Sequence, residues 1–495
     1  MTITDEPETR HLAGDAETRR DCFHVVILGG GATGALMAAH LLRQSDRVAV
    51  TLVEGTYRPG RGIAYSTTDP DHLLNTRADM MTAYPDDPLH FFRWLKARPE
   101  GSGMTEQSFV SRCTYGDYLT DQLRDSAGAC GDRLRHVQGI CERLDDSGRG
   151  VVARLADGTT IAADLAILAT GHAVPRPDPR GLTSGAWEGV DGIDPDGTVV
   201  IVGTGLSMVD QVLSLSRANH RGQIVTVSRR GLLPRPHVPG RNPFPVDAAD
   251  VPFGAPMSVV TRWARDLARR ARAEGKNWRD AIDNIRPHAI ALWKAAPQAE
   301  RARFLRHAVA WWDVHRHRIP PRSAALIDRA VAGGQLIHRR GAFLRAEAGE
   351  AGSVRAIIRP HGQDATTAID AARIIDCRGI RNDPERHATP LVAGLLADGK
   401  ARVDVLRVGL EVTGDCHLID RDGHPSDRIL AIGPVSRAAF WEITAIPDIR
   451  VQVAAVAARI AAQADAIAAQ ADARVAAVPE IAPKISASQA PARQA

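Results

Sequence analysis

Three glycines spaced as G-x-G-x-x-G lie near the start of the chain, at Gly29, Gly31 and Gly34. Glycine at these positions allows a tight turn, lets the backbone approach a pyrophosphate, and lets the next helix pack closely with its N-terminal N–H groups facing the phosphates. Glu54 follows twenty residues after Gly34, where it can accept hydrogen bonds from a ribose. These residue types at this spacing predict a dinucleotide site.

The residues around this loop predict the elements that hold it. Val25 to Leu28 form a continuous apolar run, as a parallel strand covered on both faces requires, and Val48 to Val53 read as the next strand. A glycine motif alone is a weak signal, but strand, loop, helix, strand and acid in this order predict a dinucleotide-binding unit. The alternative is a glycine-rich turn that holds no ligand.

An internal repeat of the fingerprint, VVIVGTGLSMVD, begins 174 residues after the first. Gly203 matches Gly29 and Gly205 matches Gly31, whereas Met208 stands in place of the third glycine. We expect this methionine to push the helix slightly off the strand and to leave both phosphate-facing glycines intact. The repeat therefore predicts a second dinucleotide site.

The position of the acid differs between the two repeats. Ser228 aligns with Glu54 and is followed by Arg229 and Arg230. This change removes the carboxylate that favours a free 2′-hydroxyl and supplies guanidinium groups for a 2′-phosphate. The second site is therefore predicted to prefer NADPH to NADH, the alternative being arginines on a solvated edge.

The length and composition of the chain limit the number of domains and the kinds of partner to expect. A chain of 495 residues exceeds what one hydrophobic core usually supports, so we expect two or more domains. The 62 basic and 58 acidic residues nearly balance, which gives no reason to expect a nucleic acid partner or an anionic membrane.

The six cysteines show no C-x-x-C and no metal-ligand spacing, so reduced thiols without a metal are expected. Residues 1–20 do not read as a secretory signal, and the uncharged run Val25 to Leu42 belongs to the nucleotide unit, so we expect a soluble cytoplasmic protein.

Further elements follow from composition and periodicity. Residues 60–95 are dense in Gly, Asp, Asn and Pro and read largely as loop, with a short helix over 87–95 whose Leu89, Phe92 and Leu95 point inward. Another helix is expected over 115–123 and a last one over 447–464. Short strands are expected over 135–170, 354–358, 373–375 and 430–433, and a linker over 178–196.

Residues 255–330 read as helices that carry several tryptophans. We expect most of these to anchor a core: Trp263, Trp278, Trp293, Trp311 and Trp312. The run from Trp311 to Arg318 contains H-x-H, but no third ligand is near. A helix end followed by Pro320 and Pro321 is favoured over a metal site.

Long co-linear motifs resemble one bacterial family of FAD/NAD(P)-binding proteins. They are GRGIAYSTTDPDHLLNTRADMMTAYPDDPLHFFRWL, GTGLSMVD, SRRGLLPRPH, WWDVHRHR and RAAFWEITAIPDIRVQ, within a match from residue 24 to about residue 460. The family includes nitrosuccinate-forming aspartate N-monooxygenases and FAD-dependent urate hydroxylases. The sequence departs from it at Arg378, where relatives typically have threonine, and at Arg437-Ala438, which replaces Arg-Gly; both changes are expected to alter the contour of the flavin pocket.

The resemblance implies an α/β fold, that of a two-dinucleotide-binding-domain flavoprotein with a Rossmann-like FAD domain and an inserted Rossmann-like NADPH domain. The turn Ala169-Thr170-Gly171 would mark the chain leaving the FAD domain. That domain would comprise residues 21–195 and 365–465, and the NAD(P)H-binding domain, with its helical insertion, residues 196–364. Residues 1–20 and the Ala/Pro-rich tail 466–495 are expected to be disordered.

Site residues are predicted in the fingerprints and in the motifs that carry the resemblance. The cofactor-binding residues are Gly29, Gly30, Gly31, Ala32, Thr33, Gly34, Glu54, Arg61, Tyr65, Asn75, Thr170, Gly171, Gly203, Gly205, Leu206, Ser207, Ser228, Arg229, Arg230, Gly433, Pro434, Trp441 and Thr444. Arg77, Arg437 and Glu442 are nominated for catalysis as polar groups in pocket-lining motifs. Arg77 would anchor an acidic substrate or contact the FAD phosphates or its own loop, and Trp441 would pack near the isoalloxazine or in a core.

Two nucleotide sites on one chain suit an FAD that is reduced by NADPH. No C-x-x-C is present for a disulfide relay, so oxygen is the expected electron acceptor, through a flavin C4a-hydroperoxide. The leading hypothesis is an FAD-dependent NADPH monooxygenase that N-hydroxylates a small amino acid such as aspartate. Its partners would be a small-molecule substrate and oxygen, and a homo-oligomer stays open. The alternatives are a reductase or dehydrogenase that passes electrons to a partner, a urate-type hydroxylase, and a flavin-binding protein without turnover.

Overall fold

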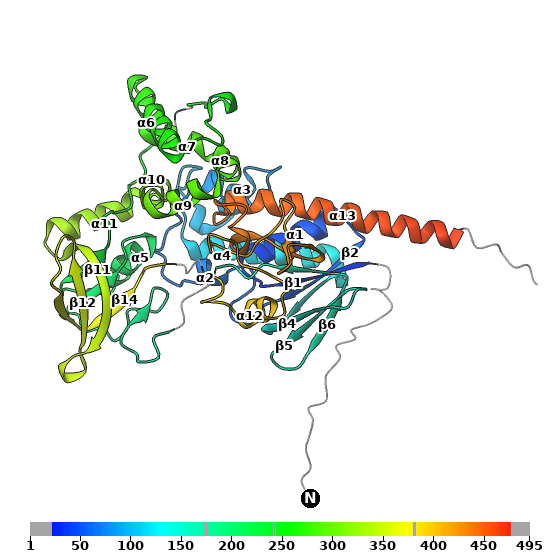
Figure 1. Cartoon of the computed structure of the whole chain (residues 1–495), viewed down its shortest axis with the longest axis horizontal. Coiled ribbons are helices and arrows are strands. Elements are labelled where there is room, and N and C mark those ends of the chain that lie inside the picture. Colours follow the sequence, from blue (N-terminus) through cyan, green and yellow to red (C-terminus); the bar gives the residue numbers. More distant parts are fainter. Residues whose placement is uncertain (1–21, 173–176, 241, 243, 380–382, 477–495) are drawn as a thin grey trace, which may run out of the picture.

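Two sheets of mainly parallel strands organise the chain (Figure 1). The computed structural model describes residues 22–172, 177–240, 242, 244–379 and 383–476. The N-terminal segment 1–20 and residues 477–495 of the tail, both expected to be disordered, lie outside the described residues.

The first unit is built on a six-stranded sheet in the order β15-β16-β7-β1-β2-β3. All neighbouring strands run parallel except β15, which is antiparallel to β16. The strands are β1 (Phe23–Leu28), β2 (Val48–Val53), β3 (Leu134–Val137), β7 (Leu165–Leu168), β15 (His417–Ile419) and β16 (Pro425–Ala431). β2 and β7 are buried along their whole length, as their apolar sequences require in a sheet that is covered on both faces.

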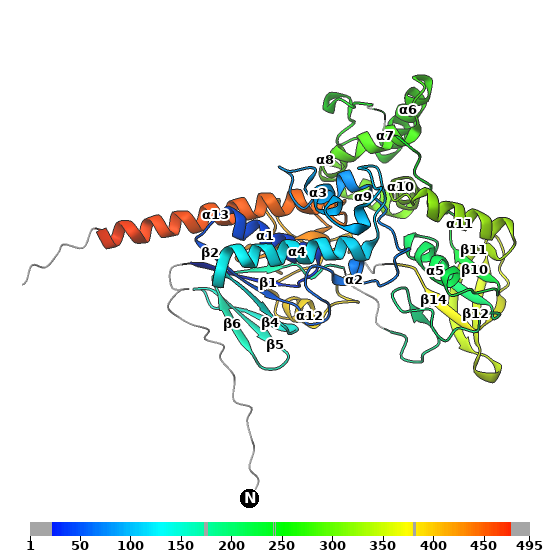
Figure 2. The same ribbon diagram turned by 180° about the vertical axis from the view of Figure 1, so that it is seen from behind.

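Helices cover one face of this sheet and a small antiparallel sheet lies on the other, as Figures 1 and 2 show. The helices of the first unit are α1 (Ala32–Gln44), α2 (Gly62–Tyr65), α3 (His90–Lys96), α4 (Arg112–Cys130), α12 (Pro390–Ala397) and α13 (Ile446–Ala476). The small sheet consists of β4 (Cys141–Asp146), β5 (Val151–Leu155) and β6 (Thr160–Ala163). α1 and α13 lie side by side, although they are far apart in the sequence.

The second unit is built on a seven-stranded sheet in the order β13-β12-β11-β10-β9-β14-β8. Its strands are β8 (Ser184–Gly185), β9 (Val199–Val202), β10 (Ile224–Ser228), β11 (Leu336–Ala348), β12 (Val354–Pro360), β13 (Thr367–Ala371) and β14 (Arg373–Asp376). β11 pairs with β10 along its first half and with β12 along its second half. Helices α5 (Leu206–Arg217) and α11 (Pro321–Ala332) pack on this sheet.

A helical insertion lies between β10 and α11 and stands at the top of Figure 1. It consists of α6 (Met257–Ala273), α7 (Trp278–Ile285), α8 (Ala289–Ala295), α9 (Gln298–His307) and α10 (Val309–Arg316). The insertion docks on the first unit: Trp293 Nε1 donates a hydrogen bond of 2.8 Å to the carbonyl of Ala438, and Arg286 pairs with Asp448 at 2.5 Å.

Strand pairing contradicts the predicted boundaries between the units. β14 lies parallel to β9, and β13 extends the same sheet, so residues 367–376 belong to the second unit and not to the first. The predicted linker contains β8, which pairs with β14. Sequence predicted β14 as a strand, but a short apolar run does not show which sheet it will join.

Three predicted elements differ in extent or orientation. α13 continues to Ala476 and not to residue 464, because its second half is alanine-rich and contains no glycine or proline. The last strand covers 425–431 and not 430–433. In α3 the buried residues are Phe91 and Leu95, whereas Leu89 is 38% exposed.

α13 is long and apolar enough to cross a membrane by length and composition over Ile446–Gln470, with a mean hydropathy of 1.3. Its inward side chains, among them Val453, Val456 and Ile460, belong to the core that also contains β1 and α1. Of this stretch 39% is buried, and a single helix of this kind is weak evidence for a membrane span.

Candidate functional site

The first glycine loop joins β1 to α1. Gly29 has φ +110°, and a Cβ there would lie 2.5 Å from the carbonyl oxygen of Ala169. A Cβ on Gly34 would lie 1.9 Å from the carbonyl oxygen of Gly29, so both glycines are required by packing. A Cβ on Gly31 would meet nothing closer than Gly62 Cα at 3.5 Å. A Cβ on Gly31 would thus be in ordinary contact with the start of α2, and Gly31 stands at the N-terminus of α1, where a dinucleotide pyrophosphate is predicted to bind.

Glu54 is held in place at the end of β2. Its Oε2 accepts a hydrogen bond of 2.9 Å from the Gly30 N–H, and its Oε1 accepts from the N–H groups of Thr56 and Tyr57 at 2.8 and 3.0 Å. A carboxylate has about four acceptor sites, so capacity remains for a ribose hydroxyl. Binding of a ribose by Glu54 stays a prediction.

The segment after β2 folds over this loop. The Gly60 N–H donates to the Gly30 carbonyl at 2.8 Å, which places α2 beside Gly31. Arg61 forms an ion pair with Asp117. The Tyr65 ring meets the Tyr115 ring edge-on at 5.0 Å, and burial raises the pKa of Tyr65. Arg61 and Tyr65 thus lie in the predicted region, with both side chains engaged by protein.

The last segment of the first unit returns to the same edge. Gly433 has φ +68°, and a Cβ there would lie 2.6 Å from Thr33 Oγ1, so this turn packs directly on α1. Thr170, Gly171, Pro434 and Arg437 line one cavity of about 40 Å³. The structure therefore brings together predicted residues from both ends of the chain.

A loop of the first unit binds the second unit through two other predicted residues. Arg77 is 8% exposed, and its Nη2 donates to the carbonyls of Val238 and Gly240 at 2.6 and 3.0 Å. The carbonyl of Asn75 accepts a hydrogen bond of 3.0 Å from His237 Nε2. These contacts favour the loop-contact alternative for Arg77.

Charged side chains gather where the helical insertion meets the first unit. Glu442 is 3% exposed; its Oε1 accepts a hydrogen bond of 2.8 Å from Trp312 Nε1, and its Oε2 lies 3.3 Å from Arg316 Nε. Burial acts to raise the pKa of Glu442, but Arg316, His317 and the Trp312 hydrogen bond outweigh it, so the pKa is lowered. These contacts hold Glu442 against α10, and its nomination for catalysis stays a prediction. Nearby, the Thr444 N–H donates to the Glu442 carbonyl at 2.6 Å.

Asp313 and His317 form an acid–base pair in this cluster. His317 Nε2 lies 3.8 Å from Asp313 Oδ1, and the two side chains are 29% and 44% exposed. Burial among protein atoms raises the pKa of Asp313 to about 6 and lowers the pKa of His317 to about 4. Both side chains are thus largely surrounded by protein and remain partly accessible to solvent. Sequence analysis assessed this segment only for metal binding and missed the i, i+4 spacing that makes the pair.

Arg437 connects this cluster to an aromatic group. Its Nε donates to the Trp441 carbonyl at 3.2 Å, and its guanidinium carbon lies 4.1 Å from the centre of the Trp441 ring. Burial lowers the pKa of Arg437 although Asp313 and Glu442 act to raise it. Trp441 is 4% exposed and stacks on Trp293 with ring centres 4.6 Å apart.

The second glycine loop joins β9 to α5, which Leu206 and Ser207 open. Gly203 has φ +107°, and no atom lies within 4 Å of a Cβ built on Gly205. Met208 is fully buried and is accommodated without loss of the loop. The loop is therefore open to a second pyrophosphate at the N-terminus of α5.

The arginines that follow β10 lie at the surface. Arg229 and Arg230 are both exposed after Ser228, and Arg230 Nη2 donates to the Arg306 carbonyl at 2.7 Å. In the sheet Ser228 lies opposite Arg340 of β11, which is also exposed. Sequence analysis missed Arg340, because the pairing of β10 with β11 across the helical insertion is not visible in the sequence.

The turn that carries Arg378 is not in the flavin pocket as expected. The carbonyl oxygen of Cys377 would lie 2.4 Å from a Cβ on Gly203, so the turn packs on the second glycine loop. Arg378 folds back onto Asp376 at 2.6 Å. Its position follows from β14, which belongs to the second sheet.

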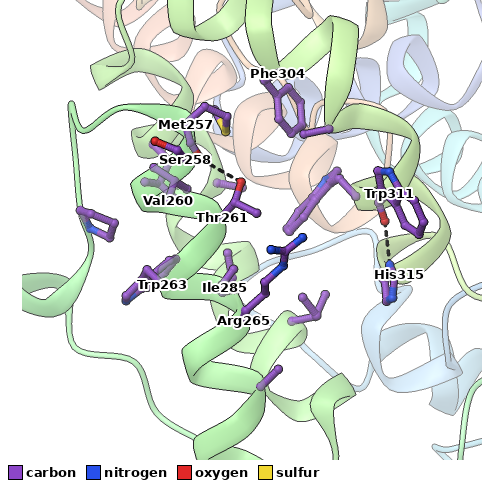
Figure 3. Close-up of a pocket in the computed structure, with 18 of the residues that line it drawn as sticks. Met257, Ser258, Val260, Thr261, Trp263, Arg265, Ile285, Phe304, Trp311 and His315 are labelled. Atoms are coloured by element: carbon purple, nitrogen blue, oxygen red, sulfur yellow. Dashed lines mark hydrogen bonds between the residues drawn. The ribbon is translucent and has the colours of Figure 1, made fainter.

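A large pocket of about 1150 Å³ lies within the helical insertion (Figure 3). Six of the chain's eight tryptophans line it, including Trp441 of the first unit. The tryptophans of the insertion were expected to be mostly core residues, but only Trp293 is buried, and Trp311 is 49% exposed. They line a pocket because the insertion is too thin to enclose them.

The remaining predictions concern metals and thiols. No group of three His, Cys, Asp or Glu side chains within the described ranges is placed to hold a metal ion. α10 ends at Arg316 and α11 begins at Pro321, which confirms the predicted helix end. All six cysteines are free thiols.

Comparison with known proteins gives a family-model match to part of the chain and a similarity of fold. Residues 26–173 match a protein-family model described as FAD-NAD(P)-binding, and no curated protein matches the chain. The reduced form of ornithine hydroxylase from Pseudomonas aeruginosa is 15% identical with a TM-score of 0.58, over 89% of this chain and 99% of that one. The Kutzneria sp. 744 ornithine N-hydroxylase, solved with reduced FAD, NADP⁺ and L-ornithine, is 15% identical with a TM-score of 0.59 over the same shares. The FAD-bound cadaverine monooxygenase from Erwinia amylovora is 12% identical with a TM-score of 0.59, over 88% of this chain and 92% of that one.

These similarities, at low identity, show the fold. The chain has the α/β fold of these flavoproteins, with parallel sheets and Rossmann-like units, which confirms the predicted fold class. The family model confirms that the first unit is of the FAD-NAD(P)-binding kind.

Proposed function

We propose, from the premise that this chain has the fold of N-hydroxylating flavoproteins and an FAD-NAD(P)-binding first unit, that it is an FAD-dependent, NADPH-reduced monooxygenase. The observation that carries the proposal is the pair of equivalent glycine loops, at Gly29–Gly34 and at Gly203–Gly205, each at the N-terminus of a helix. Two such loops accommodate an electron-donating and an electron-accepting dinucleotide on one chain.

The residues of the chain would bind and orient the cofactors. Gly29 to Gly34 and Glu54 hold FAD, and Gly203, Gly205 and Arg229 hold NADPH. Bound FAD, once reduced by NADPH, supplies the activation of oxygen. Arg437 and Trp441 pack against the helical insertion beside the small cavity that Thr170 and Pro434 line, and they would limit the access of water there.

Asp313 can carry a proton in this charged cluster. Burial raises its pKa to about 6, so it exchanges protons near neutral pH, whereas burial and then the cationic Arg316 lower the pKa of His317 to about 4. We assign to the Asp313 carboxylate the acceptance of the proton that the substrate nitrogen loses when its new N–O bond forms.

The proposed reaction is N-hydroxylation of an amine. The solved structures of similar fold are of enzymes whose names give ornithine and cadaverine as substrates. The family resemblance of the sequence gives aspartate as the first small amino acid to test. A reductase without oxygenation is the second candidate, because the same two loops suffice for it.

The test is NADPH oxidation by the FAD-loaded protein in air with a panel of amines and amino acids, and mass spectrometry of the products. A product heavier by one oxygen atom, labelled when ¹⁸O₂ is supplied, supports the monooxygenase. Oxidation of NADPH that yields only hydrogen peroxide with every amine refutes it and supports the reductase.

A further inference from the structure

We infer that the pocket of the helical insertion binds the body of the organic substrate, and that this substrate is bulky, mainly apolar and anionic. The inference rests on the proposed monooxygenase and replaces its small amino acid with a larger substrate. It is carried by the size of the pocket and by the residues that line it.

The size of the pocket excludes a small amino acid as its natural occupant. Pockets of roughly 300–1,000 Å³ hold drug-sized ligands, and this pocket measures about 1150 Å³. Aspartate would leave most of it filled with water against apolar walls. Figure 3 shows Met257, Val260, Ile285, Phe304 and Trp311 around the space.

The aromatic lining favours a flat or extended apolar body. Trp293 and Trp441 stack on each other, and Phe304 meets Trp441 edge-on with ring centres 5.4 Å apart. Trp311 stays 49% exposed, which is costly for so large an apolar side chain unless a ligand covers it. Such surfaces bind alkyl chains and aromatic rings.

The charges in the lining have one sign. Five arginines and two histidines line the pocket, and no aspartate or glutamate does so among the described residues. Arg265 of α6 extends into the space between α6 and Trp311 in Figure 3 and makes no ion pair with any residue that the structure describes. Burial, and then the cationic Arg318 and Arg235, lower the pKa of Arg279. A ligand carboxylate would therefore meet complementary charge.

Trp441 and Arg437 lie between the pocket and the small cavity beside Thr170 and Pro434. Trp441 lines the pocket, its ring lies under Arg437, and Arg437 lines the cavity. Trp312, which also lines the pocket, donates to Glu442. The pocket therefore adjoins the first unit, and the anionic end of its ligand would lie near Arg265.

The test uses 12-aminododecanoic acid, which carries an amine, a long apolar chain and a carboxylate. Calorimetric titration of the FAD-loaded protein is expected to show binding at least about a hundredfold tighter than that of aspartate. The methyl ester of the same compound keeps the chain and removes the anion, and it is expected to bind about tenfold more weakly than the acid.

Two substitutions on one helix locate the site. R265A is expected to weaken binding of the acid about tenfold and to leave binding of the ester unchanged. R269A is the matched control: it lies one helical turn further along α6, outside the lining, and is expected to change neither. Circular dichroism and FAD occupancy of both variants should equal those of the wild type.

Several results would overturn the inference. The first is that 12-aminododecanoic acid binds no more tightly than aspartate, and the second is that R265A and R269A weaken its binding equally. The third is that W311E changes the oligomeric state and leaves binding of 12-aminododecanoic acid intact, which would make the pocket an interface between two copies of the chain. Because titration needs no turnover, intact binding without any oxygenated product would instead count against the proposed function.

Discussion

Gly29 and Gly203 occupy equivalent positions in two strand–turn–helix units. Their φ angles are +110° and +107°, and a Cβ on either would lie 2.5 or 2.4 Å from the carbonyl oxygen of a residue that follows a neighbouring parallel strand, Ala169 and Cys377 respectively. The repeat that is visible in the sequence therefore extends to the turn that backs each glycine. The equivalence makes the two loops controls for each other.

Replacing the second glycine of either loop, Gly31 or Gly205, should abolish binding of one cofactor and preserve binding of the other. We expect G31V to lose FAD, because the side chain would occupy the space that a pyrophosphate needs, and G205V to keep FAD and lose NADPH binding. FAD occupancy measured from absorbance, and flavin reduction by NADPH in a stopped-flow instrument, decide this. Full FAD occupancy in G31V would contradict the assignment.

Coenzyme preference should depend mainly on Arg229. Arg230 is already bonded to the Arg306 carbonyl, whereas Arg340 lies opposite Ser228 and can contribute. A charge-assisted contact is worth roughly 1.5–3 kcal/mol, so the wild type should prefer NADPH by about ten- to a hundredfold in kcat/KM. R229A should lose most of this preference, and R230A and R340A less.

The control for coenzyme preference is R345A. Arg345 lies on the same strand as Arg340 but is paired with Glu347 at 2.6 Å, so its removal should not change the preference. Equal use of both coenzymes by the wild type, or an unchanged ratio in the triple variant R229A/R230A/R340A, would refute the role of these arginines.

Acid should destabilise the fold partly through His237. Burial, helped by Arg318 and Arg77, lowers its pKa to about 3, against about 6.5 in the unfolded chain. The neutral form is therefore favoured by folding, and its contribution is complete above pH 6.5 and is lost as the pH falls towards 3. At pH 5 the loss is about 2 kcal/mol.

The measurement for His237 is the free energy of unfolding in urea at pH 7 and pH 5. H237Q should show a smaller decrease between the two values than the wild type. H424Q is the control, because the His424 side chain is 78% exposed. An identical decrease in H237Q and wild type would show that the histidine does not act in this way.

The rate of oxygenation should change with pH as Asp313 gains or loses its proton. Its pKa of about 6 predicts a change in kcat between pH 5 and 7 that D313N abolishes, with KM for NADPH unchanged. D415N, at an exposed aspartate, should keep the profile of the wild type. Persistence of the same profile in D313N would assign the titration to another group.

The C-terminal strand should be needed for the first unit, and the end of α13 should not. β16 pairs with β7 inside the sheet, so deletion of residues 430–495 should abolish FAD binding. Deletion of residues 466–495 removes only the last part of α13 and the tail and should leave a yellow, folded protein. A stably yellow protein after the longer deletion would contradict the split architecture.

Features that depend on nearby residues could be predicted from the sequence, and features that depend on distant residues could not. The strand–loop–helix units around both glycine loops and the helix end before Pro320 depend on neighbours within a few turns of chain, and their local structure was predicted correctly, whereas binding of cofactors there stays a prediction. β14, Arg340 and the pocket tryptophans depend on which distant strand or helix lies opposite. Trp263 and Trp293 look alike in the sequence, yet only the second is buried, because it meets Trp441 from the other end of the chain.

The split first sheet fixes an order of events during synthesis. β7 ends at Leu168, but its partner β16 begins only after the whole second unit and the helical insertion have been made. At roughly 5–20 residues per second, the ribosome takes tens of seconds to reach it. Throughout that time one edge of the first sheet is unpaired while the second sheet can already close. The nascent chain is therefore expected to need a chaperone that covers the edge of β7. A run of slowly translated codons just before residue 425 would lengthen the time for which the chaperone is needed.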